Sequence, residues 1–346
     1  MTALPDGFAG RVVRWQRTHG RNSLPWQNTR DPYRVWLSEI MLQQTQVSTV
    51  LDYYSRFLVR FPDVRRLAAA QPDEVMALWS GLGYYSRARN MHRCAQDVVA
   101  LHGGEFPRTA GLLQTLPGIG RSTAAAIASF CFGERVAILD GNVKRVLTRV
   151  LGFGADLAQA GNERELWAYA EALLPRRALE ESMPRYTQGL MDLGATVCLA
   201  RNPACLVCPA SGLCVAHREG NPEDYPVKTR KLKRTSQALW LLRARNAQGS
   251  TWLEKRPATG IWAGLYCLPV YESRDALQAA LPAKAQARLQ DGEPFLHVLT
   301  HKDLHLHPVA IEMPSGSPRT EAGAWFAGSE LPRIGLPAPI RRLLQD

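Results

Sequence analysis

The sequence predicts a multidomain protein in which an all-α part is followed by a smaller α/β part. Residues 8 to about 220 show helical periodicity, interrupted by turn signals such as Gly103-Gly104 and Pro117-Gly118. After about residue 236 the pattern changes to short strand-like runs. The 346 residues are enough for two separate hydrophobic cores. We therefore expect domains at 1–220 and 237–346, joined by a linker at 221–236.

The expected linker is polar and basic. Its sequence is NPEDYPVKTRKLKRTS, and its cations are Lys228, Arg230, Lys231, Lys233 and Arg234. A solvated hinge and a strap along nucleic-acid phosphates are both consistent with this composition.

The C-terminal part contains six apolar runs that we expect to be strands: ALWLLRA, TWLEK, GLYCLPV, FLHVLT, DLHLHPVAIEM and AWFA. Helices are expected near 275–282 and 337–344. In DLHLHPVAIEM the histidines His305 and His307 alternate with leucines, which predicts a strand with one solvated face rather than a metal site.

Composition describes an ordinary soluble protein, with 46% apolar and 21% charged residues. No stretch has the length of a membrane span, and the N-terminus lacks the apolar core of a signal peptide, so we expect a bacterial-type cytoplasmic location, associated with the nucleoid through DNA, and no membrane partner. The net charge of +11 favours a polyanionic partner, with nucleic acid ahead of membrane. A basic but unspecialised surface explains the charge equally well.

One acidic residue lies among apolar ones in VWLSEIMLQQTQV, residues 35–47. Asp31 and Pro32 predict the N-cap and first turn of a helix there, and the apolar residues recur at helical spacing. Glu39 falls inside this pattern. Burial raises the pKa of a carboxyl group, which then either has a structural partner or stays protonated for use as an acid.

The segment LLQTLPGIGRSTAAAIASF, residues 112–130, predicts a helix, a tight turn and a second helix. Gly118 and Gly120 allow close approach to a ligand, and the second helix presents free amides and its positive dipole end, as a phosphate site requires. A plain helical hairpin explains the same pattern. In the following VAILDGNVKRVLTRV, Asp140 stands at a predicted N-cap, and capping alone is the simplest interpretation.

Four of the seven cysteines fall within seventeen residues: Cys198, Cys205, Cys208 and Cys214. In a reducing compartment such a group more often binds metal than forms disulfides. Tetrathiolate zinc and a 4Fe-4S cluster are both consistent with four thiolates in one loop. The remaining cysteines are expected to be buried apolar residues.

These segments together resemble the MutY family of adenine DNA glycosylases, in the helix-hairpin-helix, endonuclease III-like superfamily. The motifs SEIMLQQTQV, GLGYYSRARN, LPGIGRSTAAAI, LDGNVKR and GLMDLGATVC occur in order between about residues 8 and 220. The cysteine intervals of six, two and five residues are similar to those of the superfamily's 4Fe-4S loop. The resemblance implies a helix-hairpin-helix glycosylase domain whose four cysteines hold a 4Fe-4S cluster.

The resemblance also implies roles for three polar residues. Glu39 would be the general acid that protonates adenine and later activates water, and Asp140 would stabilise the oxocarbenium ion or attack the sugar. Asn142 would orient Asp140 or the substrate. Further candidate contacts to substrate or DNA are Trp26, Gln44, Tyr84, Gly118, Gly120, Ser122 and Asp192.

Two of these contacts would replace the base that leaves the stack, Gln44 as a wedge and Tyr84 by intercalation. Trp26 and Asp192 would shape the adenine pocket, with core packing or helix capping as the alternative. The cations Arg87, Arg89 and Lys144 are candidates for phosphate contacts, or else solvated surface charges.

The segment RPATGIWAGLYCLP, residues 256–269, resembles the strand and loop region of a Nudix fold. The following VYESRDALQAALPAK lacks the acidic metal box of Nudix hydrolases. This implies a catalytically silent Nudix-like domain, which in the MutY family recognises 8-oxoguanine. Where the family has Phe-Ser-His, this sequence has Leu299, Thr300 and His301, so the hydroxyl and imidazole remain and the aromatic ring does not.

We therefore expect a monomeric enzyme that hydrolyses the N-glycosidic bond of adenine opposite 8-oxoguanine or guanine in double-stranded DNA, leaving an abasic site. A bifunctional glycosylase and lyase of the endonuclease III type needs a Schiff-base lysine where this chain has Ser122. A non-enzymatic damage binder is opposed by the presence of both Glu39 and Asp140. A nucleotide hydrolase is opposed by the missing Nudix metal box.

Overall fold

The computed structural model describes residues 4–229, 233–313 and 323–345. By its internal contacts the chain divides into two compact units. The first comprises Met1–Ala68 and Arg93–Lys231, and the second comprises Ala69–His92 and Leu232–Asp346. The sequence-based domain boundaries stay a prediction, but residues 69–92, which they assign to the helical domain, pack with the C-terminal part.

The first unit is helical, as predicted. Its helices, of which α6 begins in the second unit, are α1 (Phe8–His19), α2 (Pro32–Leu42), α3 (Val47–Arg60), α4 (Val64–Ala68), α6 (Ser86–His102), α7 (Ala110–Leu113), α8 (Arg121–Phe132), α9 (Gly141–Leu151), α10 (Ala160–Ala172), α11 (Leu179–Thr196) and α12 (Val215–Arg218). Short 3-10 turns follow α11: η1 (Cys205–Val207), η2 (Ser211–Leu213) and η3 (Pro222–Asp224).

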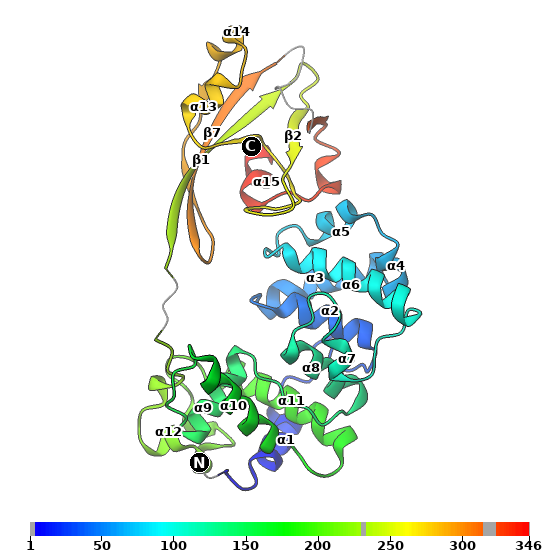
Figure 1. Cartoon of the computed structure of the whole chain (residues 1–346), viewed down its shortest axis with the longest axis vertical. Coiled ribbons are helices and arrows are strands. Elements are labelled where there is room, and N and C mark those ends of the chain that lie inside the picture. Colours follow the sequence, from blue (N-terminus) through cyan, green and yellow to red (C-terminus); the bar gives the residue numbers. More distant parts are fainter. Residues whose placement is uncertain (1–3, 230–232, 314–322, 346) are drawn as a thin grey trace. The chain divides into compact units, whose positions relative to one another are not determined.

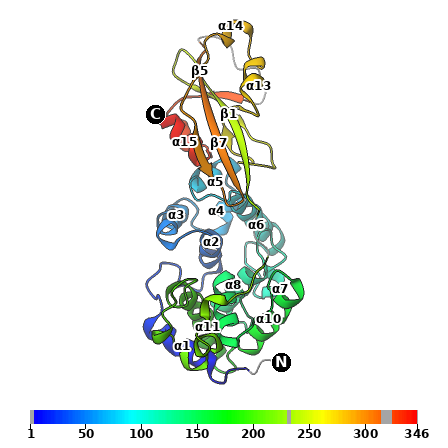
Figure 2. The same ribbon diagram turned by 90° about the vertical axis from the view of Figure 1, so that its left-hand side faces the viewer.

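Helix α11 packs against α1, α8 and α9, and both views show α1 and α11 side by side (Figures 1 and 2). Fully buried side chains from these helices, among them Val12, Val143 and Leu193, form one hydrophobic core. A second contact joins α2 to α8. The polar residues of α2, α8, α9 and α11 are therefore held by a packed scaffold rather than by loops.

The predicted helix starts are confirmed. The Asp31 side chain accepts a hydrogen bond from the Tyr33 amide at the start of α2, and Asp140 caps α9 in the same way. The first helix of the predicted hairpin is the four-residue α7, and its second helix is α8. Gly118 has the left-handed φ of 77° that the tight turn requires.

The second unit is built on one mixed sheet, in which β1 and β7 are the long central strands (Figure 1). Its strands are β1 (Thr235–Arg245), β2 (Thr251–Lys255), β3 (Tyr266–Cys267), β4 (Val270–Tyr271), β5 (Gln290–Asp291), β6 (Phe295–Val298), β7 (Lys302–Glu312) and β8 (Gly323–Phe326). Its helices are α5 (Pro72–Trp79), α13 (Arg274–Ala279), α14 (Ala283–Gln286), η4 (Leu331–Arg333) and α15 (Ala338–Gln345).

The sheet order is β3-β2-β1-β7-β5, with β4 paired to β1, β6 to β7 and β8 to β2. Strands β1 and β7 are parallel, with Thr235 opposite Lys302, and the other pairs are antiparallel. All six predicted runs contain strand, although GLYCLPV divides into β3 and β4. Along β7, Leu304 and Leu306 are buried while His305 is exposed, which confirms the predicted alternation.

Strand β1 begins at Thr235, inside the segment 221–236 that the sequence predicts as a linker. Arg230 and Lys231, two of its predicted cations, lie outside the described residues. Arg234 pairs with Asp303 and donates to the Leu299 carbonyl (3.2 Å), so it is part of the sheet unit. None of the helices in the described ranges has the length and apolar character that crossing a membrane requires.

Residues 69–92 join the sheet unit through polar contacts of α5 and the turn after it. Ser80 Oγ donates to the Leu336 carbonyl at 2.6 Å, and the Tyr85 hydroxyl donates to the same carbonyl at 3.2 Å. Asp73 accepts from Tyr266 (3.2 Å) and pairs with Lys255. These contacts fix the turn at residues 80–85 to the C-terminal part.

Candidate active site

A cavity of about 1470 Å³ opens in the first unit. Its walls come from the segment after α1, from the end of α2, from the first turns of α8 and α9, and from α11. The cavity brings together six of the predicted site residues: Trp26, Glu39, Gln44, Ser122, Asp140 and Asn142. Its volume exceeds the roughly 300–1,000 Å³ of small-molecule sites, so it is large enough for a nucleotide with flanking backbone.

Glu39 enters this cavity from the third turn of α2. Burial among the apolar residues of that helix, followed by repulsion from the Asp140 carboxylate, raises its pKa to about 8. Glu39 is therefore mainly protonated at neutral pH. It has the acidity that a proton donor working near pH 7 needs.

Asp140 is held at the start of α9. Its Oδ1 accepts hydrogen bonds from the amides of Asn142 (2.7 Å) and Val143 (2.9 Å). Ser122 Oγ accepts from the Leu139 amide at 3.1 Å and so fixes the chain just before the cap. The Asp140 carboxyl group thus lies at the positive end of the α9 dipole.

Arg145 supports Asn142 from one turn further along α9. Its Nη2 donates to Asn142 Oδ1 (2.9 Å) and to the Gly194 carbonyl (2.6 Å), and its Nε donates to the Cys198 carbonyl (2.8 Å). α9 and α11 approach so closely here that a Cβ on Gly194 would lie 2.7 Å from Asn142 Cβ. Neither Arg145 nor Gly194 was predicted as a site residue from the sequence.

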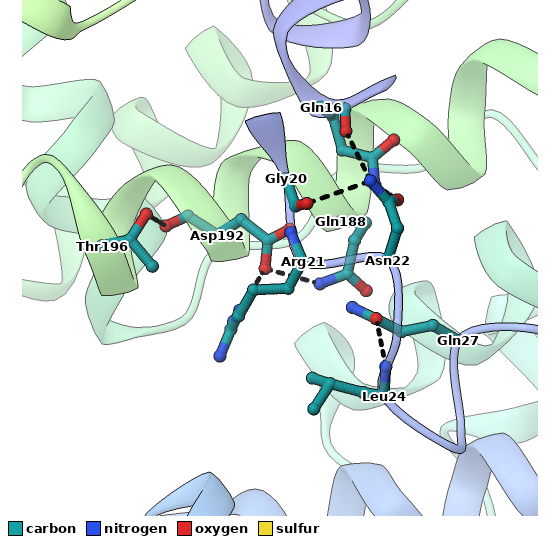
Figure 3. A network of polar contacts seen from close by, with 9 residues as sticks. All are labelled: Gln16, Gly20, Arg21, Asn22, Leu24, Gln27, Gln188, Asp192 and Thr196. Carbon is teal, nitrogen blue, oxygen red and sulfur yellow. Dashed lines mark hydrogen bonds and ion pairs between the residues drawn. The ribbon is translucent and has the colours of Figure 1, made fainter. Parts of the chain in front are cut away.

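Asp192 is fully buried, and Figure 3 shows its side chain next to Arg21 and Gln188. Its carboxylate accepts from Arg21 Nε (2.7 Å), the Arg21 amide (3.0 Å) and Gln188 Nε2 (2.8 Å). Gln188 itself lines the cavity. Asp192 therefore orients a side chain of the cavity wall, that of Gln188. Gln188 was not predicted from the sequence, although it precedes Asp192 by one helical turn.

Two further predicted residues shape the cavity mouth and wall. Trp26 is 7% exposed and packs edge to face on Tyr54, with ring centroids 5.2 Å apart. Gln44 is exposed and has a left-handed φ of 55°, which is uncommon for a residue other than glycine and is concentrated at functional sites. Gln27, which also lines the cavity, accepts from the Leu24 amide through Oε1 (3.1 Å).

The hairpin before α8 has the backbone that a phosphate site needs. Gly120 is the N-cap of α8, and no side chain caps the first-turn amides. A Cβ on Gly120 would meet no atom within 4 Å, so the approach to these amides is open. Lys144, a candidate phosphate contact, instead pairs with Glu163 at 2.7 Å.

Three further predicted site residues, Tyr84, Thr300 and His301, lie in the second unit. Tyr84 is 41% exposed, has a left-handed φ of 48°, and its hydroxyl hydrogen-bonds to the Thr300 hydroxyl. Thr300 and His301 are exposed in the turn between β6 and β7, and the His301 carbonyl accepts from the Thr235 amide (3.2 Å).

The Arg87 side chain is buried beside the 81–84 turn, so its interpretation as a solvated surface charge is wrong, while its phosphate contact stays a prediction. Arg89 donates to the Ala263 carbonyl rather than lying free.

The four clustered cysteines surround one small apolar cavity, which Val146, Val150 and Leu193 also line. Arg149, itself buried, donates to Cys198 Sγ at 3.3 Å. Burial, the backbone and the neighbouring thiols leave the Cys208 pKa raised to about 11, with burial as the main cause. Within the described ranges, no three His, Cys, Asp or Glu side chains are grouped so as to hold a metal ion.

Comparisons with known proteins agree with this geometry. Residues 37–171 match the model of the HhH-GPD superfamily of base excision DNA repair proteins, and residues 240–346 match the NUDIX domain model. The adenine DNA glycosylase of Buchnera aphidicola subsp. Acyrthosiphon pisum (strain APS) is 35% identical over 345 residues, which cover 98% of this chain and 97% of the relative. The chain belongs to the adenine DNA glycosylase family.

Other relatives and solved structures match a smaller share of the chain. The mouse (Mus musculus) adenine DNA glycosylase is 45% identical over 221 residues, which are 61% of this chain and 42% of the mouse protein. The structure of a thermostable thymine-DNA glycosylase superposes with a TM-score of 0.54 at 29% identity, covering 61% of this chain and 95% of that one. The expected fold, a helix-hairpin-helix glycosylase domain with a Nudix-like domain, is confirmed. As a member of this family the chain is a DNA repair glycosylase, a hydrolase of N-glycosyl bonds.

Proposed function

We propose that the protein hydrolyses the N-glycosidic bond of adenine paired with 8-oxoguanine or guanine in duplex DNA, leaving an abasic site. The observation that carries this proposal is a pair of carboxyl groups in one cavity whose environments differ. Glu39 is kept protonated by burial, whereas Asp140 caps the N-terminus of α9 and accepts two backbone hydrogen bonds there. The choice of adenine as the base that is removed rests on the relatives, which are named adenine DNA glycosylase.

In the proposed reaction Glu39 gives its proton to the purine ring, which makes the base a better leaving group. As the bond breaks, positive charge develops on the sugar. The Asp140 carboxylate stabilises that charge, or bonds to the sugar carbon for a time, while Asn142 holds the loop in place. Glu39, now ionised, then activates the water that adds to the sugar.

Recognition of adenine is assigned to Gln188. Its amide nitrogen is committed to the Asp192 carboxylate, so its Oε1 is the group that it presents to the cavity. A carbonyl oxygen accepts a hydrogen bond from the exocyclic amino group of adenine and repels the O6 acceptor of guanine. The amides at the start of α8, with Gly118 and Gly120, would bind a DNA phosphate.

The second unit is proposed to read the opposite base. Tyr84 would enter the stack beside it, Gln44 of the first unit would fill the gap left by adenine, and Thr300 and His301 would hydrogen-bond to 8-oxoguanine. The exposure of Tyr84, Thr300 and His301 supports this role. The protein is further proposed to work as a monomer in the cytoplasm.

A 4Fe-4S cluster held by Cys198, Cys205, Cys208 and Cys214 is also a proposal. The four cysteines line one small cavity, and four thiolates in one loop are the ligand set of such a cluster. Such a cluster would tie the loop after α11 to α9. Iron and acid-labile sulfide should both be found in the purified protein and be lost together in Cys205→Ser.

The deciding experiment uses a duplex with one adenine opposite 8-oxoguanine, labelled on the adenine strand. Strand scission that appears only after alkali is expected, because a monofunctional glycosylase leaves an abasic site. None of the residues that line the described cavity is a lysine, so scission without alkali is not expected.

Matched reactions separate the alternatives. A duplex with thymine opposite the adenine should stay intact, and Glu39→Gln should bind the lesion duplex but release adenine far more slowly than the unaltered protein. Scission without alkali would overturn the monofunctional assignment, and tight binding by the unaltered protein without any abasic product would favour the damage binder.

A further inference from the structure

We propose that Arg87 is a positioning residue that holds the Tyr84 ring in the orientation used to read the base opposite adenine. The inference rests on the proposed function, because it assigns Tyr84 to that contact. It goes further by identifying what fixes Tyr84. Tyr84 belongs to the turn at residues 81–84, which lies between α5 and α6 in the second unit.

The backbone conformation of this turn needs support from residues outside the turn. Gly81, Gly83 and Tyr84 all have left-handed φ values, of 107°, 70° and 48°. Glycine adopts these angles readily, but tyrosine is strained there. The Tyr84 conformation must therefore be stabilised by contacts from outside the turn.

Arg87 supplies these contacts from the first turn of α6. Its Nη2 donates to the carbonyls of Leu82 and Gly83, both at 3.2 Å. Its guanidinium lies 5.4 Å from the centroid of the Tyr84 ring and 5.1 Å from that of Trp79. Trp79 Nε1 donates to the same Gly83 carbonyl at 3.1 Å. One guanidinium thus joins the backbone of the turn to the face of the tyrosine ring.

The Tyr84 side chain is consequently held at two places. Arg87 contacts the ring face, and Thr300 bonds to the hydroxyl. Thr300 stands in the turn that is proposed to read 8-oxoguanine. A ring fixed at both places can report the identity of the opposite base, whereas a ring free to rotate would enter any weakened stack equally well.

Arginine is required by this geometry, and lysine would not replace it. The guanidinium is planar, so it can stack on two rings and still donate in its plane, while an ammonium group is compact and strongly hydrated. Arg87 is only 8% exposed, so a hydrated ammonium would not fit its place. Arg87→Lys keeps the charge and removes both the stacking and the forked donors.

The test compares single-turnover rates of adenine release opposite 8-oxoguanine and opposite guanine, using the full-length protein. Arg87→Lys is expected to lower the ratio of the two rates by about tenfold, as the loss of a partly desolvated cation–π contact would do. Arg93→Lys, an exposed arginine on the same helix, is the matched control and should leave the ratio unchanged. Melting temperatures identify any loss of folding.

A double-mutant cycle decides whether Arg87 acts through Tyr84. In a Tyr84→Leu background, Arg87→Lys should have no further effect on the rate ratio, because the ring that it positions is absent. Equal effects of Arg87→Lys in both backgrounds would overturn the inference. An unchanged ratio in Arg87→Lys alone would overturn it as well.

A second variant changes the turn at residues 81–84 without altering the buried Arg87. Gly83→Ala meets no atom within 4 Å but penalises the left-handed backbone, so it should lower the same ratio while Arg87 is intact. The proposed function is tested separately, because it fails only if the unaltered protein releases no adenine from either duplex.

Discussion

Glu39 is held neutral by its surroundings at a pH where a solvent-exposed glutamate is ionised. If its proton is the one given to adenine, the rate of base release should be constant below about pH 8 and fall as the pH rises through that value. Glu39→Gln should lower the rate by about 10²- to 10⁴-fold, as loss of a general acid does. Single-turnover rates from pH 6 to 9 measure both effects.

The same group makes stability depend on pH. Its pKa is raised from 4.5 in the unfolded chain to about 8 in the folded one, so between these values the folded state binds more protons. The free energy of unfolding therefore falls as the pH rises through this window. Glu39→Gln should raise the melting temperature at pH 8 and change it little at pH 4, and an equal gain at both pH values would contradict the assignment.

At this scale the sequence was sufficient where a residue breaks a local pattern. Glu39 interrupts an apolar helix face, and Asp140 stands at an N-cap, so both were predictable. Gln188 and Arg87 were not, because their importance lies in partners that folding brings to them: Asp192 orients Gln188, and the turn at residues 81–84 encloses Arg87.

The packing of α9 on α11 places Asn142 and Asp140 relative to the rest of the cavity. Gly194→Ala would force a Cβ to within 2.7 Å of Asn142 Cβ, so the two helices must separate. We expect a loss of about 1–3 kcal/mol in the free energy of unfolding, as for overpacked cores, together with slower adenine release. Denaturant unfolding and single-turnover kinetics test this.

Gly161 in α10 provides the matched substitution. A Cβ there would lie 3.9 Å from the nearest atom, at the end of the Arg164 side chain. Gly161→Ala should therefore leave the rate unchanged and increase stability by up to about 1 kcal/mol. If both alanines slow adenine release equally, the α9 to α11 contact is not what positions the site.

Elements were predictable to the extent that their signals are local. The Asp-Pro cap of α2 and the alternation of β7 could be recognised from the sequence. Strand β5, Gln290–Asp291, has only two polar residues and owes its existence to pairing with β7, which no local pattern contains. Helix α7 is likewise short because the tight turn follows directly after it.

At the scale of the whole molecule, residues 69–92 belong by contact to the sheet unit although they lie within the segment that matches the glycosylase family model. A chain truncated after residue 231 would lose Leu336, the partner of Ser80 and Tyr85. Amide hydrogen exchange at residues 72–89 should therefore be faster in the truncated chain than in the full one, while α9 exchanges alike in both. Equal exchange at 72–89 would show that this segment needs no C-terminal partner.

No sequence pattern predicts that residues 69–92 pack with the C-terminal part, because the residues in contact are some 250 positions apart in the chain, as Ser80 and Leu336 are. Periodicity identifies the helices on either side, and the change of composition identifies the linker. The unit with which a helix packs depends on tertiary contacts, and these form only when the chain folds.

The division into two units has a topological result. The polypeptide passes from one unit to the other three times, after residues 68, 92 and 231. A single cut in the basic segment near residue 230 would leave two covalent connections intact. In such a nicked molecule Tyr84 would stay covalently joined to the catalytic unit through α6. The residue proposed to read the opposite base and the residues proposed to remove adenine are therefore connected independently of the linker.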